Sequence, residues 1–223
     1  MNFDYTYIVL FGYVIYEPLT ILTNLVFFAL TVFCFRQLND SPQLYAKQMA
    51  WFLLTLGIGS CFGALAHGVH YQLGALFFRT IFFLTNAFSL ISIYFCFRSA
   101  YTYYTDEPNK YVISFVVIWV AILMVSSLIK GEFLLIKIHA GIVLMYSMAA
   151  HYLVYRKTRE RGSRIIVTGI LISFLSIIVH SLKISFGEHF NYKDIAHVIM
   201  IITLIFIYKG AALNIDELER KEV

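Results

Sequence analysis

The stretch GIGSCFGALAHGVHYQ, residues 57–72, is the most informative for the fold. It ends an apolar run over residues 48–72 that is long enough to cross a bilayer. The run carries two histidines, His67 and His70, and Ser60 precedes the first by two helical turns. Ionisable groups in membrane helices are costly, and they usually face the bundle interior or a water-filled cavity. The stretch therefore predicts a membrane helix with one polar, functional side.

The composition of the whole chain supports the same interpretation. Of 223 residues, 60% are hydrophobic and 13% are charged, with a mean hydropathy of +0.77. A soluble domain would carry about 25% charged residues. We therefore predict an integral membrane protein without a removable signal peptide. The net charge of +4 is interpreted as a topology signal, so no nucleic-acid partner is expected. The three cysteines have no metal-ligand or disulfide spacing and are predicted to be small buried side chains.

Apolar runs predict an all-α fold, a single domain over residues 1–223 that forms a seven-transmembrane helix bundle. The predicted spans are roughly residues 7–35, 48–72, 75–98, 111–129, 133–155, 165–187 and 194–213. Loops are short, and a tight turn near Gly74 joins the second and third spans. Polar punctuation such as RKTRERGSR, residues 156–164, predicts the other connections.

The distribution of positive charge predicts the orientation. Five of the 17 Lys and Arg residues fall on one side, and the rest fall on the side that holds the C-terminus. The five are Arg79, Lys130, Lys137, Lys183 and Lys193. Because cytoplasmic loops carry the excess of Lys and Arg, the N-terminus is predicted outside and the C-terminus in the cytoplasm. Short loops and abundant Phe and Ile favour a bacterial inner membrane.

Placed on this topology, the polar residues of the spans gather in the outer half. Residues three, four or seven apart share a helix face, which aligns several of them in stripes. His139 stands alone on its span and is predicted to form an interhelical hydrogen bond. Asp194 is interpreted either as the N-cap of the last span or as a site residue. Ser173, Ser176 and Thr20 are interpreted as bonded to their own backbone or to a neighbouring helix. The candidate site residues are Glu17, Ser60, His67, His180, Asp194 and His197.

Three stretches resemble a known family of membrane hydrolases. YEPLTILTNLVFF, residues 16–28, is similar to the first transmembrane helix of the alkaline ceramidases. GIGS, residues 57–60, resembles the opening of their second helix, and DIAHVIMIITLIFIYKGA, residues 194–211, resembles their last helix. The alkaline ceramidases belong to the CREST superfamily of seven-helix hydrolases. The resemblance implies zinc held by one second-helix histidine and two last-helix histidines, beside a serine and an aspartate.

The chain departs from this pattern at two of the three ligand positions. Ala64 stands where the resemblance places the second-helix histidine, and Lys193 stands four residues before His197, where it places another. Only His197 matches by strict position. The family's aspartate would fall near Ala75, and this part of the chain has no carboxylate.

Two functional hypotheses follow. In the first, a zinc ion is held by His67, His197 and either His180 or Asp194, with a coordination position left for water. The ion would activate that water for hydrolysis of a lipid amide or ester, with Ser60 positioning the water or the oxyanion. Glu17 would act as general base or hold a second cation. In the second, the scaffold has lost its metal centre and binds a lipid or ligand without catalysis. A small transporter or channel is a weaker third class, since no row of charges crosses the cytoplasmic half.

Overall fold

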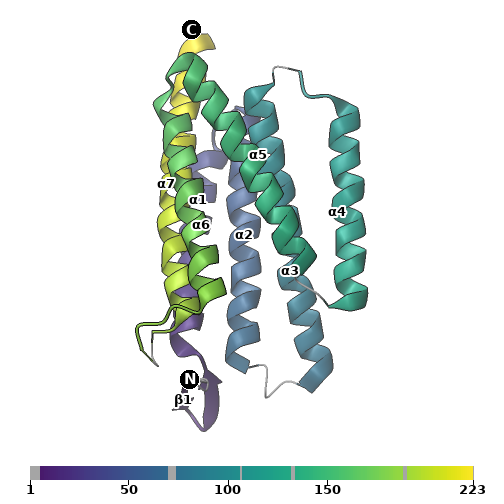
Figure 1. Ribbon diagram of the computed structural model, residues 1–223, viewed down its shortest axis with the longest axis vertical. Helices are drawn as coiled ribbons and strands as arrows, with labels where there is room; N and C mark the ends of the chain where they lie inside the picture. Colours follow the sequence, from purple (N-terminus) through teal and green to yellow (C-terminus); the bar gives the residue numbers. More distant parts are fainter. Residues whose placement is uncertain (1–5, 70–73, 106, 132–133, 188–189, 223) are drawn as a thin grey trace.

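The computed structural model describes residues 6–69, 74–105, 107–131, 134–187 and 190–222 and forms a bundle of seven long helices (Figure 1). All seven are long and apolar enough to cross a membrane, which confirms the predicted fold class. α4 has 21 residues and is therefore about 31 Å long, the thickness of a bilayer's hydrocarbon core. The helices are α1 (Pro18–Asn39), α2 (Leu44–Val69), α3 (Gly74–Tyr104), α4 (Lys110–Lys130), α5 (Leu134–Thr158), α6 (Arg161–Leu182) and α7 (Tyr192–Glu222).

The predicted start of the first span is wrong. Residues Tyr7–Leu10 (β1) and Tyr13–Tyr16 (β2) form an antiparallel hairpin, and the helix begins only at Pro18. Phe11 and Gly12 both have positive φ, the combination that closes a two-residue hairpin turn and that a helix cannot contain. The strands are rich in β-branched and aromatic residues, so their hydropathy resembled that of a membrane helix.

The ends of the later helices also differ from the predicted spans. Most of residues 156–164, predicted as a loop, is helical, because α5 continues to Thr158 and α6 already begins at Arg161. α6 ends at Leu182, where Lys183 takes a left-handed conformation, five residues earlier than predicted. α7 continues to Glu222, well beyond the predicted end at residue 213. Polar residues past the apolar run thus extend α5 and α7 instead of ending them.

The first and last helices place the two chain ends at opposite ends of the bundle (Figure 1). α1 lies beside α2 and α7, α6 packs along α7, and α5 crosses from α6 towards α3 (Figure 1). α4 is the outermost helix and packs on α3. The hairpin, the end of α2 and the starts of α1, α3, α5 and α7 lie at one end of the bundle, which we call the hairpin end.

The helices α6 and α7 pack closely at two glycines, Gly162 and Gly210. A Cβ on Gly162 would stand 2.0 Å from the side-chain oxygen of Asn214 and 2.5 Å from the backbone oxygen of Gly210. The two helices can approach this closely only because both positions are glycine. The largest buried cluster lies nearby, between α1, α2, α3 and α7, and includes Phe27, Leu53 and Leu204.

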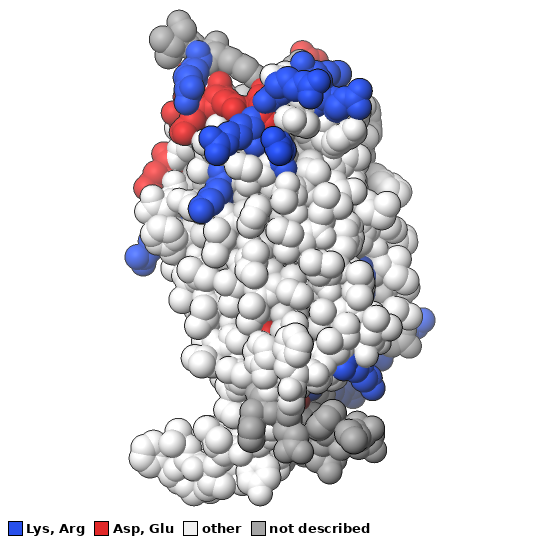
Figure 2. All heavy atoms as spheres, turned by 60° about the vertical axis from the view of Figure 1, so that its left-hand side comes forward, with Lys and Arg blue, Asp and Glu red and all other residues white. Residues whose placement is uncertain are grey.

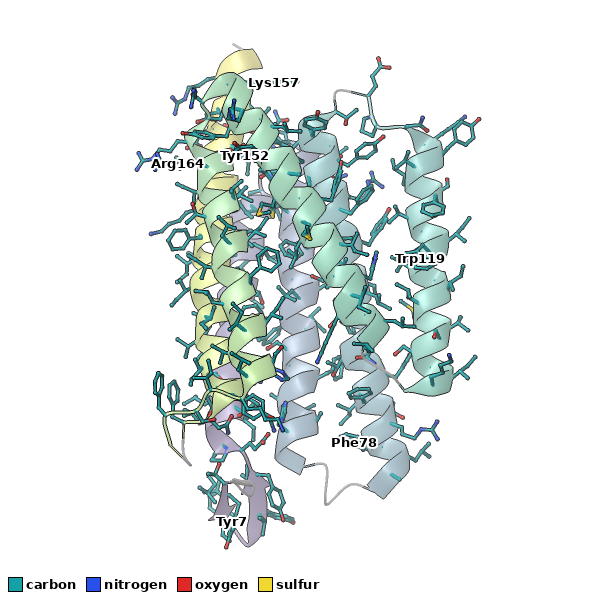
Figure 3. The ribbon with its side chains drawn as sticks, viewed as in Figure 1. Tyr7, Phe78, Trp119, Tyr152, Lys157 and Arg164 are labelled. Atoms are coloured by element: carbon teal, nitrogen blue, oxygen red, sulfur yellow. The ribbon has the colours of Figure 1, made fainter. Side chains whose placement is uncertain are left out.

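The surface has the polarity expected of a membrane protein. On the face shown in Figure 2, charged side chains are sparse at mid-height, and Lys and Arg gather at the end that holds the C-terminus. Lys157 and Arg164 lie at that end, opposite Tyr7 of the hairpin (Figure 3). Ser173 and Ser176 donate to the carbonyls of Ile170 and Ser173, so both bond to their own helix backbone, as predicted. All three cysteines are free, and Cys34 and Cys96 are buried.

Candidate functional site

Glu17 sits at the hairpin end, immediately before α1, and its backbone is strained. It is the N-cap residue with φ 48° and ψ 54°, the left-handed conformation that costs about 1–2 kcal/mol for a non-glycine residue. Pro18 disfavours the right-handed helical conformation for the residue before it. The backbone N–H of Glu17 donates to the carbonyl of Thr6, which ties the hairpin to the helix start. The prediction that Glu17 lies deep within the first span is therefore wrong, because the span begins after it.

The carboxylate of Glu17 nevertheless is buried, because it turns into the bundle. Only 4% of the residue is exposed, and its side chain does not cap α1. Instead, Oε2 lies 2.5 Å from Nδ1 of His67 on α2, and Oε1 accepts a hydrogen bond from Nζ of Lys193 on α7. Burial raises the pKa of Glu17, but the hydrogen bonds and charges of His67 and Lys193 outweigh it, so that its pKa is lowered. The carboxylate is thus ionised and joins three helices.

A second group of contacts lies about two turns further along α1. The buried Asn24 accepts a 2.5 Å hydrogen bond from Ser60 of α2 on its side-chain oxygen. Its amide nitrogen lies 3.3 Å from Nδ1 of His197 on α7. The hydroxyl of Thr23 lies 3.1 Å from the same ring nitrogen. Ser60 and His197, both predicted site residues, are therefore connected through Asn24.

Asp194 uses both of its oxygens inside the protein. Oδ2 accepts from the backbone N–H of Asn191, while Oδ1 of Asn191 accepts from the backbone N–H of Lys193. This reciprocal pair is a capping box at the start of α7. Oδ1 of Asp194 accepts a 2.6 Å hydrogen bond from Thr20 of α1, and both residues are fully buried. Asp194 is thus not the N-cap itself, because α7 begins at Tyr192 and Asn191 precedes it; as the third residue of the helix, Asp194 completes the cap and also makes an interhelical contact.

The structure brings most of the predicted site residues together. We call Glu17, Ser60, His67, Lys193, Asp194 and His197, with Thr20, Thr23 and Asn24, the hairpin-end cluster. His180 lies at its edge, exposed, with its ring edge-on to Tyr192 at 5.1 Å between centroids. Electrostatic interactions link His197 to His180, His67 and Lys193. His70 and His189 lie outside the described residues.

The residues predicted to bind zinc are engaged in contacts with other side chains. Within the described ranges, no three His, Cys, Asp or Glu side chains are grouped so that they could hold a metal ion. Nδ1 of His67 contacts Glu17. Nδ1 of His197 contacts Thr23 and Asn24. Both side-chain oxygens of Asp194 accept hydrogen bonds. Zinc binding by His67, His197, His180 and Asp194 stays a prediction from the sequence.

Sequence reasoning missed the role of Lys193. It counted this residue as a topology charge and as a departure from a family pattern, whereas its ammonium group bonds the buried carboxylate. The available signal was its position next to Asp194 at the start of the last span, level with Glu17 at the start of the first.

A second polar cluster, at the opposite end of the bundle, was also missed. The hydroxyl of Tyr103 donates to Glu160 at 2.6 Å, and the amide of Asn214 donates to Tyr45. His151 is fully buried, with its ring 5.2 Å from that of Tyr103. These residues come from α2, α3, α5, α7 and the start of α6, so they tie five helices together. Each is isolated in the sequence, which left no local pattern.

A protein-family model matches most of the chain. The chain matches no curated protein. A family model described as "Family of unknown function (DUF6962)" matches residues 19–216, which includes His67, Lys193 and His197 and begins two residues after Glu17. Because this match extends over nearly the whole bundle, the chain belongs to the DUF6962 family of unknown function.

Proposed function

We propose that this chain binds the anionic headgroup of a membrane lipid at the hairpin-end cluster, without metal-dependent hydrolysis. One observation carries the proposal: Lys193, four residues before His197, places its ammonium group on the Glu17 carboxylate. In the ceramidase resemblance this position belongs to a metal-binding histidine. The cation expected beside Glu17 is therefore, in our proposal, the protein's own ammonium group. The chain would be a CREST-like scaffold that has exchanged a metal centre for an internal ion pair.

The charges around the cluster favour an anionic group. Glu17 is one carboxylate shared by two basic partners, His67 and Lys193, which are 33% and 18% exposed. Lys137 and Lys183 interact electrostatically with His180 at the edge of the cluster. Asp194, the other acid, is fully buried and occupied by hydrogen bonds. Lys137 and Lys183 thus add positive charge beside the cluster, which would attract a phosphate or carboxylate headgroup.

We further propose that the hairpin end faces outward and the C-terminus the cytoplasm. The support is the gathering of Lys and Arg at the C-terminal end, where cytoplasmic loops carry most positive charge (Figure 2). The membrane we propose is a bacterial inner membrane. With this orientation, the hairpin-end cluster lies near the outer leaflet, within reach of its lipid headgroups.

Thermal unfolding in detergent micelles tests the binding proposal. Added dioleoyl-phosphatidylglycerol is expected to raise the apparent Tm of the wild type in a saturable way, because a ligand that binds only the folded state stabilises it. Dioleoyl-phosphatidylcholine, which has no net charge, is expected to have a much smaller effect. The lipid-induced shift should be lost in Lys193→Met and kept in Arg164→Gln, which removes a charge from the opposite end. Equal shifts for both lipids, or an unchanged shift in Lys193→Met, would contradict the proposal.

The second candidate is a zinc-dependent hydrolase of lipid amides or esters. It is favoured by the contact of Ser60 with Asn24, which joins two residues of the ceramidase resemblance beside His197. It requires about one zinc per chain in purified protein, lost in His67→Ala or His197→Ala. Metal-free wild-type protein would favour headgroup binding instead.

A further inference from the structure

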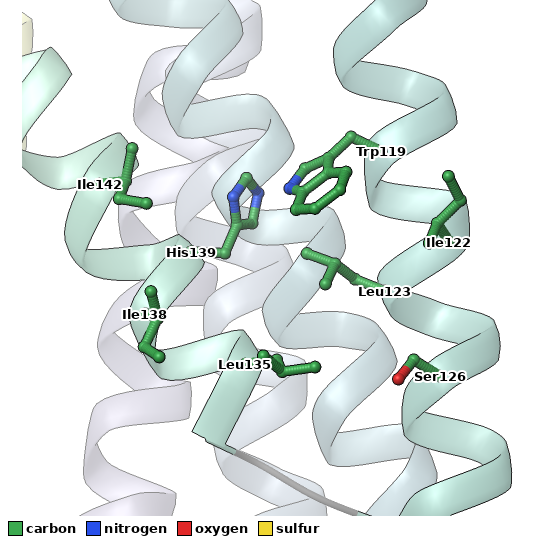
Figure 4. A pocket seen from close by; sticks show the side chains of 8 residues that line it. All are labelled: Trp119, Ile122, Leu123, Ser126, Leu135, Ile138, His139 and Ile142. Atoms are coloured by element: carbon green, nitrogen blue, oxygen red, sulfur yellow. The ribbon is translucent and has the colours of Figure 1, made fainter.

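A small cavity opens between α4 and α5, away from the hairpin-end cluster. Its volume is about 210 Å³, and its walls are almost entirely apolar (Figure 4). Trp119 and Leu123 line it from α4, and Ile138 and Ile142 line it from α5. Two polar side chains also face it, His139 and Ser126. The imidazole of His139 points from α5 towards Trp119 of α4 (Figure 4).

His139 is unusual because it is buried and unsatisfied. Only 8% of the residue is exposed, and its Nε2 atom is inaccessible and has no hydrogen-bond partner in the described part of the chain. The sequence predicted an interhelical hydrogen bond here. Buried polar atoms are nearly always paired, because leaving one unpaired costs free energy. The imidazole of His139 lines the cavity, and its unpaired Nε2 therefore lacks one hydrogen-bonding oxygen, which a bound molecule reaches only after a small rotation of the side chains around it.

The cavity opens towards the bilayer. Its rim is formed by Trp119, Ile122, Ile138 and Ile142, which are apolar, exposed at the bundle surface and located within membrane-spanning helices. α4 packs on α3, so that its face towards α5 is only partly covered. A molecule that enters here comes from the lipid phase, and the apolar walls would accept its hydrocarbon part.

Depth and size restrict the class of ligand. His139 lies five residues after the start of α5, which places it about 8 Å along the helix. α5 is itself long and apolar enough to cross a membrane, so this position lies within a membrane-spanning helix and not in a loop. The volume is under the roughly 300 Å³ at which sites for drug-sized molecules begin. The cavity thus suits a short apolar segment that carries one uncharged oxygen.

We propose that this cavity binds a neutral lipid through a single hydroxyl or carbonyl oxygen, which hydrogen-bonds to Nε2 of His139. The imidazole can donate to a carbonyl or accept from a hydroxyl, so both oxygen types fit the same nitrogen. The site is independent of the hairpin-end cluster, because none of its lining residues belongs to that cluster. Trp119, beside the imidazole, provides a fluorescent reporter of occupancy.

Fluorescence quenching by brominated lipids tests this site. The chain has two tryptophans, so that Trp51→Phe leaves Trp119 as the reporter. In micelles of this variant we compare 9,10-dibromo-octadecanol with 9,10-dibromo-octadecane, which differ only in the hydroxyl group. The alcohol is expected to quench Trp119 at a concentration about two- to tenfold lower than the alkane, the range expected for one neutral hydrogen bond.

Variants of His139 in the same background separate a hydrogen bond from general lipid contact. His139→Phe keeps a ring and removes the nitrogen, so the preference for the alcohol should disappear. His139→Gln keeps a donor and an acceptor and should retain part of it. Equal quenching by alcohol and alkane with His139 intact would overturn the proposal, and so would an undiminished preference in a folded His139→Phe protein. The first comparison does not depend on whether any His139 variant folds.

Discussion

Lys193 donates a hydrogen bond to Glu17 across 176 residues of sequence, joining the start of the last helix to the start of the first. His67 holds the second oxygen of the same carboxylate. This three-helix junction is strained at Glu17, whose left-handed backbone directs the carboxylate inward. Strain of this kind persists only where surrounding contacts stabilise it, and it concentrates at functional sites.

The pair should behave as a coupled unit in a double-mutant cycle. Either Glu17→Gln or Lys193→Met alone is expected to lower the free energy of unfolding by up to about 3 kcal/mol, because each leaves a partly buried charge without its partner. The double variant should cost at least about 1 kcal/mol less than the sum of the single ones. Unfolding in mixed micelles measures all three. Lys130→Met, at the same end of the bundle, should combine additively with Glu17→Gln. Additive effects for Glu17 and Lys193 would contradict the coupling.

The Glu17 junction also predicts a pH dependence. Because the pKa of Glu17 is lowered in the folded state, its ionised form contributes stability that is complete above the ordinary value of 4.5. This contribution is lost as the pH falls through the lower folded-state pKa. The difference in apparent Tm between wild type and Glu17→Gln should therefore be constant from pH 7 to 5 and shrink below pH ~4.5. A difference that grows on acidification would be inconsistent with an ionised Glu17.

Thr20 and Asp194 form the second bond between α1 and α7. Thr20→Val keeps the shape of the side chain but leaves a fully buried carboxylate oxygen without its donor. A loss of about 1.5–3 kcal/mol in the free energy of unfolding is expected. Thr85→Val is the matched control, because the Thr85 hydroxyl donates only to a carbonyl of its own helix in the contacts described. Equal effects of the two substitutions would argue against a bond between the helices.

The close contact of α6 and α7 can be tested with two glycines. Gly162→Ala would place a methyl group 2.0 Å from Asn214 and 2.5 Å from a backbone oxygen, and α6 would have to move away. We expect a loss of about 3 kcal/mol or more, at the upper end of overpacking costs. Gly141→Ala has nothing within 4 Å and should gain about 0.5–1 kcal/mol, as alanine replaces glycine within a helix. Thermal unfolding of both variants measures these changes. A Gly162→Ala protein as stable as the wild type would show that α6 and α7 are not in close contact at this position.

The sequence predicted the seven helices because each contains an apolar run long enough for a bilayer. The prediction failed at residues 7–16, because hydropathy cannot distinguish an apolar hairpin from a helix. In the structure, Phe11 and Gly12 form the turn of this hairpin. The gathering of His67 and His197 at one end could be predicted from their depth in each span, whereas Glu17 was placed inside a span that begins after it. The pairs of atoms that bond could not be predicted, because the partner of Glu17 depends on how each helix is rotated about its axis and on how far the Lys193 side chain reaches.

The zinc content of the purified wild-type protein shows whether the ammonium group of Lys193 on Glu17 takes the place of a metal centre. After purification with added zinc and removal of excess by gel filtration, elemental analysis should find zinc at background level in the wild type. Lys193→His, which restores a histidine four residues before His197, provides the matched comparison. About one zinc per wild-type chain, lost on His67→Ala or His197→Ala, would contradict the account.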